Sequence, residues 1–378
     1  EPLFEFTLKK LPYERMFNVL TSASTEKSMT DLIINSLHSA EKPMIVIGQM
    51  NVLDAVNIRN AVMRIEKQCV VFYECLGVEC ENHKYPLFDS VVDKIKDSEE
   101  YKPDTILYIG GTLISKRMRN FLRSAKKAQT IVVNTEARIY DTFMNLHYLV
   151  QGNPVDVLEN IADDLSHEEQ NQSATLFYKR WVSLFNSQLC AYGNFVPRYS
   201  QMCAVSMFYD NVITSGMKYF VHAANSMAVR LANIYAENYV FCNRGVNGIE
   251  GCLSTAAGFF IENRRRTYCI IGDLSFFYDG NALWNKYLDG DFRILLLNNG
   301  GGGIFNSLPG LSASPAKKKY VSACHDTDAA GLCASYHVNY VSAKDISQLE
   351  TGMYDFINND YDRPVLFEVF THQDEDNK

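Results

Sequence analysis

The sequence predicts an α/β protein made of two Rossmann-like, doubly wound domains, each built on a mainly parallel sheet. Short apolar runs alternate with amphipathic stretches along the chain, as strands and helices do in such folds. The length of 378 residues exceeds one ordinary core and suits two domains of about 150–200 residues each. A polar segment at residues 163–173 interrupts the apolar pattern. We therefore expect a linker there, a central domain at 1–167 and a second domain at 168–378.

In the first half, strands are predicted where apolar residues run together, and helices where apolar residues recur every three or four positions. The expected strands are 44–48, 69–73, 105–109 and 130–134, and the expected helices are 52–67 and 115–126. Strands that alternate with helices imply a parallel sheet covered on both faces.

The second half shows the same alternation. The expected strands are 219–222, 240–243, 267–271, 293–297 and 364–370, and the expected helices are 176–189, 226–236 and one around 254–258. Asn225 or Ser226 is expected to cap the second of these helices, because short polar side chains accept from the free N–H groups of a helix start.

Composition narrows the function classes. Hydrophobic residues make up 47% and charged residues 21%, as in soluble globular proteins. A net charge of −8 argues against nucleic acid or an anionic membrane as a partner, and stable membrane insertion is not expected, because the chain lacks an apolar stretch of about 18 residues. The ten cysteines are single, with no CxxC pair, which fits a reducing cytoplasm better than a zinc or disulfide framework.

Polar residues and glycines follow three of the predicted strands in the second half. Strand 267–271 leads into Gly272-Asp273-Leu274-Ser275, strand 293–297 into Asn298-Asn299 and Gly300–Gly303, and strand 219–222 into Asn225-Ser226. Ligands of parallel α/β sheets bind beyond the carboxyl ends of the strands. We therefore expect these residues to meet on one rim.

The chemistry of these residues suits a hard cation and a phosphate. Carboxylate, amide and backbone carbonyl oxygens are ligands for Mg²⁺ (or Mn²⁺), which completes its shell with phosphate and water. A glycine run lets backbone groups approach a diphosphate closely, and helices starting near Ser226 and Phe276 would aim N–H groups at it. Each motif alone is more often an ordinary turn or loop. Their order, and the separation of 26 positions from Asp273 to Asn299, favour a binding site.

A Gly-Asp pair followed after this interval by Asn-Asn resembles the thiamine-diphosphate motif. Further segments narrow the resemblance; they are Asn243-Arg244-Gly245, Asn225-Ser226 followed by Arg230, Ile304-Phe305 and Leu308-Pro309. Together they resemble the menaquinone-pathway 2-succinyl-5-enolpyruvyl-6-hydroxy-3-cyclohexene-1-carboxylate synthase family, from about Phe220 to Pro309 and more weakly to the C-terminus.

The resemblance implies a thiamine-diphosphate-dependent transferase that condenses 2-oxoglutarate with isochorismate and releases CO₂. It implies that Asp273, Asn299 and the carbonyl of Gly301 hold the metal, and that Ile249 is the apolar wedge that bends the cofactor. The other residues expected beside the cofactor are Asn225, Ser226, Gly272, Leu274, Ser275 and Ile304. Sites of this family form between subunits, so a homodimer or homotetramer is expected.

Both implied substrates are dicarboxylates, and the resemblance assigns Lys116, Arg117, Arg230 and Arg244 to them, with Ser226 nearby. Guanidinium groups grip carboxylates bidentately. Cations at a helix start oppose the helix dipole, so the 116–117 pair asks for an anion nearby. Exposed helical or loop positions remain open for all four basic residues. The resemblance also implies an apolar wall over isochorismate from Ile304, Phe305 and Leu308, for which a place in the core is the alternative.

The chain begins Glu1-Pro2-Leu3-Phe4, which resembles the family's junction after its pyrimidine-binding domain. We therefore expect a piece of a longer protein, without the glutamate that promotes ylid formation, with no catalytic residue of its own and inactive alone. Two alternatives remain: another thiamine-diphosphate enzyme, such as an acetolactate synthase or a 2-oxoacid decarboxylase, and a non-catalytic nucleotide-binding module. Against the module, strand 44–48 is followed by Gln49-Met50-Asn51 and not by GxGxxG.

Overall fold

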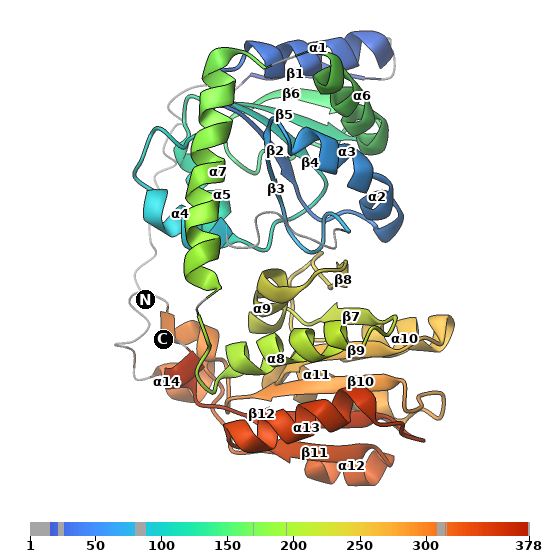
Figure 1. Ribbon diagram of the computed structural model, residues 1–378. Coiled ribbons are helices and arrows are strands. Elements are labelled where there is room, and N and C mark those ends of the chain that lie inside the picture. Colours follow the sequence, from blue (N-terminus) through green and yellow to red (C-terminus); the bar gives the residue numbers. More distant parts are fainter. Residues whose placement is uncertain are drawn as a thin grey trace, which may run out of the picture.

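The structure of the protein is a computed structural model that describes residues 16–21, 26–79, 88–168, 170–193, 195–307, 314 and 316–376. It contains two six-stranded sheets, one in each half of the chain, and every strand pair in both is parallel (Figure 1). The predicted fold class is confirmed. Leu308, from the expected apolar wall, and the opening residues Glu1–Phe4 lie outside the described residues.

The first sheet has the strand order β1-β6-β5-β4-β2-β3. Its strands are β1 (Asn18–Leu20), β2 (Pro43–Ile47), β3 (Val70–Tyr73), β4 (Thr105–Ile109), β5 (Gln129–Asn134) and β6 (Leu146–Gln151). Its helices are α1 (Glu26–Ser39), α2 (Val52–Asn57), α3 (Arg59–Ile65), α4 (Phe88–Ile95), α5 (Lys116–Ser124) and α6 (Pro154–His167). Helices α1, α3 and α6 pack on one face of the sheet and α4 and α5 on the other, as in a doubly wound fold.

The second sheet has the order β11-β12-β10-β9-β7-β8. Its strands are β7 (Phe220–Ala223), β8 (Val240–Phe241), β9 (Thr267–Gly272), β10 (Phe292–Asn298), β11 (Asn339–Ala343) and β12 (Val365–Phe370). Its α-helices are α8 (Gln201–Thr214), α9 (Met227–Tyr235), α10 (Cys252–Asn263), α11 (Asp273–Asp279), α12 (Ala330–Tyr336), α13 (Ile346–Asn358) and α14 (Gln373–Asp376). Three short helical turns complete it: η1 (Gly280–Trp284), η2 (Gly303–Ser307) and η3 (Lys317–Val321).

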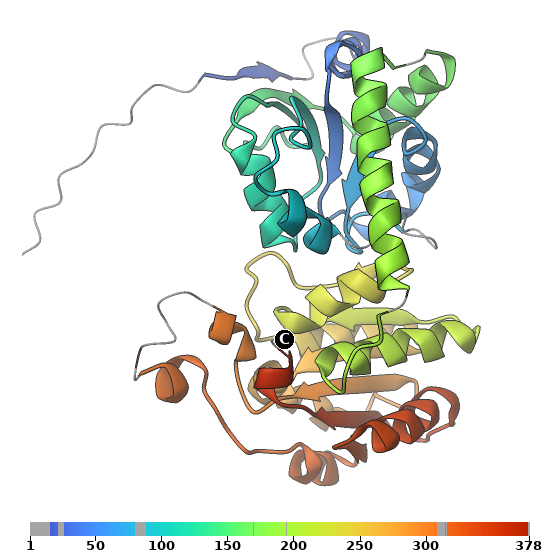
Figure 2. The ribbon, with the colours of Figure 1, turned by 60° about the vertical axis from the view of Figure 1, so that its left-hand side comes forward.

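The long helix α7 (Gln172–Tyr192) runs along the side of the first sheet (Figures 1 and 2). Its buried Phe177, Trp181 and Phe185 join the core of the first half. Helix α6 ends at His167, so most of the predicted linker is helical. The division at 167/168 stays a prediction, and the packing of α7 favours one beyond Tyr192.

The order of the second sheet explains where its ligand crevice lies. From β7 the chain adds β8 on one side and β9 on the other. Such a reversal separates the loops that leave the two strands and opens a crevice at their carboxyl ends. Asn225 and Ser226 follow β7, and Asp273 follows β9. The topology therefore brings two of the three predicted strand ends to the switch point, with the end of β10 beside them.

The first sheet reverses between β2 and β4, and there the crevice is closed. Gly48 and Gly111 pack so tightly that a Cβ on Gly48 would lie 2.1 Å from the Gly111 carbonyl oxygen. Tyr239 of the second half donates its hydroxyl to the carbonyl of Met50, at 2.7 Å. The place where a nucleotide would bind is filled by backbone and by the side chain of Tyr239, which counts against the nucleotide-binding alternative.

The two halves meet through ordered hydrogen bonds at this edge. The N–H of Val240 donates to the carbonyl of Cys75 at 2.9 Å, and the N–H of Cys75 donates to the side chain of Asn233 at 2.9 Å. Cys75, Leu76 and Ile114 are buried in the core of the second half. The carboxyl end of the first sheet is therefore fixed against β8 and α9 (Figure 1).

Arg293 holds the last turn of α13. Its side chain is fully buried and donates to the carbonyls of Phe356, Ile357 and Asn359. The last carbonyls of a helix have no partner within the helix, and a buried one left without a donor is costly. A single guanidinium thus completes the hydrogen bonding of α13 against β10.

We expect Arg293→Met to lower the free energy of unfolding by about 3 kcal/mol, because several buried carbonyls lose a charged donor. Urea titration followed by circular dichroism measures this loss. Arg265→Met, at an exposed position, should stay within about 0.5 kcal/mol of the parent. Equal stability of the two variants would contradict the assigned role.

Candidate active site

A cavity of about 120 Å³ lies at the carboxyl ends of β7, β9 and β10. All ten residues that were expected beside the cofactor line it: Asn225, Ser226, Ile249, Gly272, Asp273, Leu274, Ser275, Asn299, Gly301 and Ile304. Phe305, Gln201 and Asp376 line it as well. The structure thus gathers segments more than 70 residues apart in one place, while the roles of the individual residues stay predictions.

Asp273 is the central polar group of this cavity. The residue is 3% exposed, and its carboxylate accepts from three backbone N–H groups, those of Leu274 at 2.6 Å, Gly301 at 2.9 Å and Asn299 at 3.2 Å. Burial raises the pKa of Asp273, against the N–H donors and the nearby His325, which favour the carboxylate. Helix α11 begins at Asp273 itself and not at the expected Phe276, so the carboxylate also sits at a helix start.

The glycine run after β10 is shaped by positive backbone angles. Gly300 has φ +74° and Gly301 has φ +142°, a region that side chains disfavour. A Cβ on Gly301 would lie 2.6 Å from the carbonyl oxygen of Ser322. Only glycine fits this close approach, which turns the N–H of Gly301 toward Asp273.

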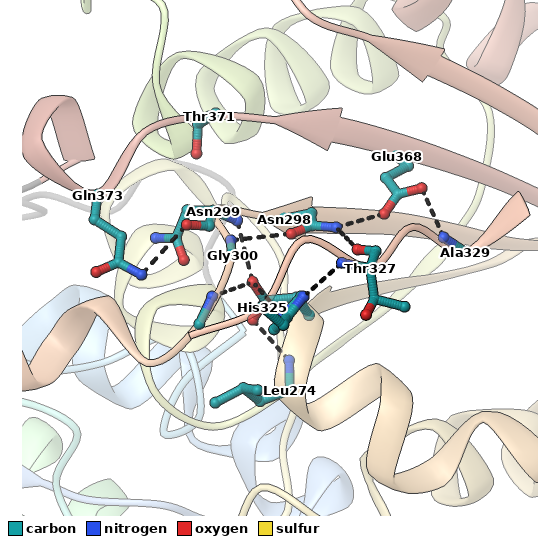
Figure 3. Close-up of polar contacts among 12 residues, drawn as sticks. Leu274, Asn298, Asn299, Gly300, His325, Thr327, Ala329, Glu368, Thr371 and Gln373 are labelled. Carbon is teal, nitrogen blue, oxygen red and sulfur yellow. Dashed lines mark hydrogen bonds and ion pairs between the residues drawn. The ribbon is translucent and has the colours of Figure 1, made fainter. Parts of the chain in front are cut away.

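Asn298 and Asn299 point in different directions (Figure 3). The side-chain N–H groups of Asn298 donate to buried Glu368 at 2.7 Å and to the carbonyl of Thr327 at 3.0 Å. Its side-chain oxygen accepts from the N–H of Gly300. Asn298 therefore fixes the loop, and Asn299 lines the cavity.

The strand-end residues after β7 form the opposite wall. Ser226 has φ +75°, which is costly for a residue with a side chain and marks a functional position in many proteins. Neither Ser226 nor Asn225 caps α9 by a side-chain hydrogen bond, contrary to expectation. Asn225 instead donates to the carbonyls of Asn243 and Gly248. Its side chain thereby anchors the 243–249 turn that carries Ile249.

A second and larger cavity, of about 700 Å³, lies between the two halves. Lys116 and Arg117, from the start of α5, and Arg230, from α9, all line it. Met227 and Ile304 line both cavities, so the two are neighbours.

Burial lowers the pKa of Arg230, and the positive charges of Arg244 and Arg117 act in the same direction, whereas the carboxylates of Asp89 and Glu74 act against it. Lys116 and Arg117 are exposed, as the solvated alternative allowed, whereas Arg230 is partly buried and Asp89 lines the same cavity. Of the three cations, Arg230 is therefore the one whose burial favours an anionic ligand.

Arg244 contacts residues of both halves of the chain next to the two cavities. It donates to the side-chain oxygen of Asn225 at 3.0 Å and to the carbonyl of Leu113, in the first half, at 3.2 Å. Its Nε is buried and has no acceptor among the residues that the structure describes. Arg244 lines neither cavity as described, so its predicted contact with substrate stays a prediction.

Comparison with known proteins places these features in a family. Residues 223–369 match the family described as "Thiamine pyrophosphate enzyme, C-terminal TPP binding domain". A 2-succinyl-5-enolpyruvyl-6-hydroxy-3-cyclohexene-1-carboxylate synthase of Bacteroides fragilis is 34% identical over 392 residues, which cover 100% of this chain and 67% of the relative. The chain belongs to this synthase family.

Further members named as the same synthase agree with this assignment. The protein of Bacteroides thetaiotaomicron is 31% identical over 390 residues, which cover 100% of this chain and 67% of the relative. That of Phocaeicola vulgatus is 31% identical over 393 residues, with 100% and 66% covered. The family resemblance read from the sequence motifs is confirmed.

Several polar residues around the synthase-family site were not predicted. His325 places Nε2 3.4 Å from the Asp273 carboxylate, while its Nδ1 accepts from the N–H of Thr327 (Figure 3). Asp376 reaches the cavity from the last described helix, α14. Each is a single residue outside any motif, so the sequence offered no signal for it. His222, which the sequence left unassigned, is buried against the rings of Phe241 and Phe259.

Glu74 is another residue that the sequence did not single out. Its carboxylate is 1% exposed and accepts from the N–H groups of Ile114 and Ser115, where α5 begins. Its carboxyl group therefore lies at the start of the helix that carries Lys116 and Arg117. Burial raises the pKa of Glu74 from 4.5 to about 7; Asp89 acts in the same direction and Arg244 against it.

Because the pKa of Glu74 is raised in the folded protein, we expect the protein to become less stable as the pH rises. The folded protein holds this proton more tightly than the unfolded chain, so the contribution is complete below about pH 4.5 and lost as the pH passes through about 7. The loss is up to about 3 kcal/mol. Urea unfolding of the parent and of Glu74→Gln at pH 5 and pH 8 measures it.

Glu74→Gln does not titrate, so its stability should fall less between the two pH values. His222, whose pKa burial lowers to about 4, titrates in both proteins and cancels in the difference. Identical pH dependence in the two proteins would show that Glu74 does not change its charge in this range.

Proposed function

We propose that the chain forms the diphosphate- and metal-binding half of an enzyme that condenses 2-oxoglutarate with isochorismate. The product would be 2-succinyl-5-enolpyruvyl-6-hydroxy-3-cyclohexene-1-carboxylate, as the names of the relatives indicate. One observation carries the proposal: a buried carboxylate, an asparagine and a glycine loop meet in a cavity at the switch point of a parallel sheet.

The donor set fits thiamine diphosphate with Mg²⁺ or Mn²⁺. Asp273, the side-chain oxygen of Asn299 and the carbonyl of Gly301 would hold the metal, since all three offer hard oxygen ligands. The cavity, at about 120 Å³, is small beside ordinary cofactor pockets of about 300–1,000 Å³. This size fits a diphosphate and its cation better than an entire cofactor. Thiamine diphosphate, when bound, supplies the carbanion chemistry.

The chain's own residues would then bind and orient the substrates. Lys116, Arg117 and Arg230 provide positive charge for carboxylates in the larger cavity, with Arg244 behind it. Ile304 lines both cavities, so it can contact the cofactor and the second substrate together. A pyruvate-using enzyme of the same cofactor class has no need for this group of cations, and this distinguishes the proposal from an acetolactate synthase or a 2-oxoacid decarboxylase.

The proposal also includes the cellular compartment and the oligomeric state of the protein. None of the helices in the described part of the chain is long and apolar enough to cross a membrane. All nine cysteines in the described residues are unpaired, which supports a reducing cytoplasm. Tyr278, Trp284 and Tyr287 are exposed around α11 and η1, and such a group supports assembly into a homodimer or homotetramer.

We expect Asp273→Ala to weaken Mg²⁺-dependent binding of thiamine diphosphate by more than about 100-fold. Replacing a residue that only hydrogen-bonds a metal ligand lowers metal affinity by roughly 10–100-fold, and losing the ligand itself should lower it further. Isothermal calorimetry on the full-length protein, with and without Mg²⁺, measures it. Asp326→Ala, at an exposed carboxylate beside His325, should bind as the parent does. Unchanged binding by Asp273→Ala would remove the proposed metal site.

We expect Arg230→Met to raise KM by at least about tenfold for one of the two dicarboxylates, because a guanidinium–carboxylate pair is lost. Affinity for thiamine diphosphate should not change, and Arg230→Lys should recover part of the loss. Steady-state kinetics with each substrate varied in turn measures this, with Arg265→Met as the control. If the protein turned over pyruvate and formed no product from isochorismate, the proposed reaction would be contradicted.

A further inference from the structure

The cofactor cavity contains one carboxylate that the proposed function does not use, that of Asp376. Its Oδ2 accepts from the side-chain N–H of Asn299 at 2.8 Å and from the hydroxyl of Thr371 at 2.8 Å. Its Oδ1 accepts from the backbone N–H of Gln201 at 2.8 Å. Asp376 therefore connects the end of β12, the start of α8 and the predicted metal ligand Asn299.

The partner of Asn299 decides which way its amide faces. A side-chain amide carries an oxygen on one side and an NH₂ on the other, and the two are close in shape. A carboxylate can only accept hydrogen bonds, so Asp376 selects the orientation in which the NH₂ faces it. The oxygen of Asn299 then faces away from Asp376. A cation needs that orientation, because an NH₂ turned toward it would repel it.

The remaining contacts keep Asp376 in this place. Gln201 is the first residue of the fourteen-residue helix α8, and a negative charge is favoured at a helix start. Gln373, also in α14, donates its side-chain N–H to the backbone carbonyl of Asn299 at 3.3 Å (Figure 3). Both the backbone and the side chain of Asn299 are thus fixed by the same short helix.

We propose that Asp376 is a positioning residue for the metal site: it holds Asn299 with its side-chain oxygen toward the cation. This inference rests on the proposed function, because it needs Asn299 to be a metal ligand. Asp376 itself does not need to contact the cation, because its carboxylate already accepts from two N–H groups and one O–H group. Outer partners that orient metal ligands typically change metal affinity by about 10–100-fold when they are replaced.

The first test is Asp376→Asn in the full-length protein. With its oxygen kept on the N–H of Gln201, the new amide turns its NH₂ toward Asn299 and toward Thr371, whose hydroxyl can turn to accept. Asn299 must then rotate to accept, which presents its own NH₂ to the cation. Binding of Mn²⁺ at saturating thiamine diphosphate, followed by electron paramagnetic resonance of the free ion, should weaken by about 10–100-fold. Thermal unfolding without metal and cofactor should stay within about 2 °C.

The decisive test reverses the hydrogen bond. In the double variant Asp376→Asn with Asn299→Asp, the amide at position 376 donates to the carboxylate at position 299. Position 299 then offers oxygen on both sides, so the atom facing the cation is an oxygen again. Mn²⁺ affinity should return to within about threefold of the parent, a recovery of at least half of the predicted 10–100-fold loss on a logarithmic scale. Because a carboxylate at position 299 raises Mn²⁺ affinity by its charge alone, Asn299→Asp by itself measures that contribution, and only recovery beyond it counts as rescue.

Asp374→Asn is the matched control, because it makes the same charge change at an exposed position of the same helix. It should bind Mn²⁺ as the parent does. If the parent itself fails to bind Mn²⁺ with thiamine diphosphate, the proposed function and this inference both fail. If the parent binds and Asp376→Asn binds equally well, only the positioning role is overturned. Weak binding by Asp376→Asn without rescue in the double variant also overturns it.

Discussion

The hydrogen bonds accepted by the Asp273 carboxylate are the constraint on which the site depends. One buried side chain gathers N–H groups from its own strand end and from the loop after the neighbouring strand. The loop can reach it only because Gly300 and Gly301 adopt positive φ angles. The cost of burying the charge is offset by these donors and by His325. The carboxylate is thus the shared acceptor that links the two strand ends.

Topology extends this local constraint to the entire molecule. The second sheet reverses its winding at β7, so its crevice stays open where Asn225, Ser226 and Asp273 meet. The first sheet reverses in the same manner, but there backbone packing at Gly48 and the hydroxyl of Tyr239 fill the equivalent space. Two sheets of one architecture thus have different tasks. One can hold a phosphate, and the other supplies a rigid wall and two cations.

The parts of the molecule that could be predicted from sequence are those with a local signal. Strand 105–109 was predicted with its exact bounds, because four hydrophobic residues follow Thr105 in a row, and Asp273 and Asn299 follow such strands directly. Helix 52–67 was predicted as one but forms two, α2 and α3. Asp376, His325 and Glu74 had no signal, because their positions arise only when distant segments pack. For the same reason, the packing of α7 on the first half could not be predicted, because its apolar face does not indicate which core it packs against.

The cations that line the larger cavity come from both halves of the chain, and this has a consequence for the distance between them. Lys116 and Arg117 belong to the first sheet's α5 and Arg230 to the second sheet's α9, so their spacing is set at the seam where Cys75 meets Val240 and Asn233. The packing at this contact therefore determines how far apart the cations lie. A substitution that repacks this contact can therefore change the distance between the cations while every one of them is retained.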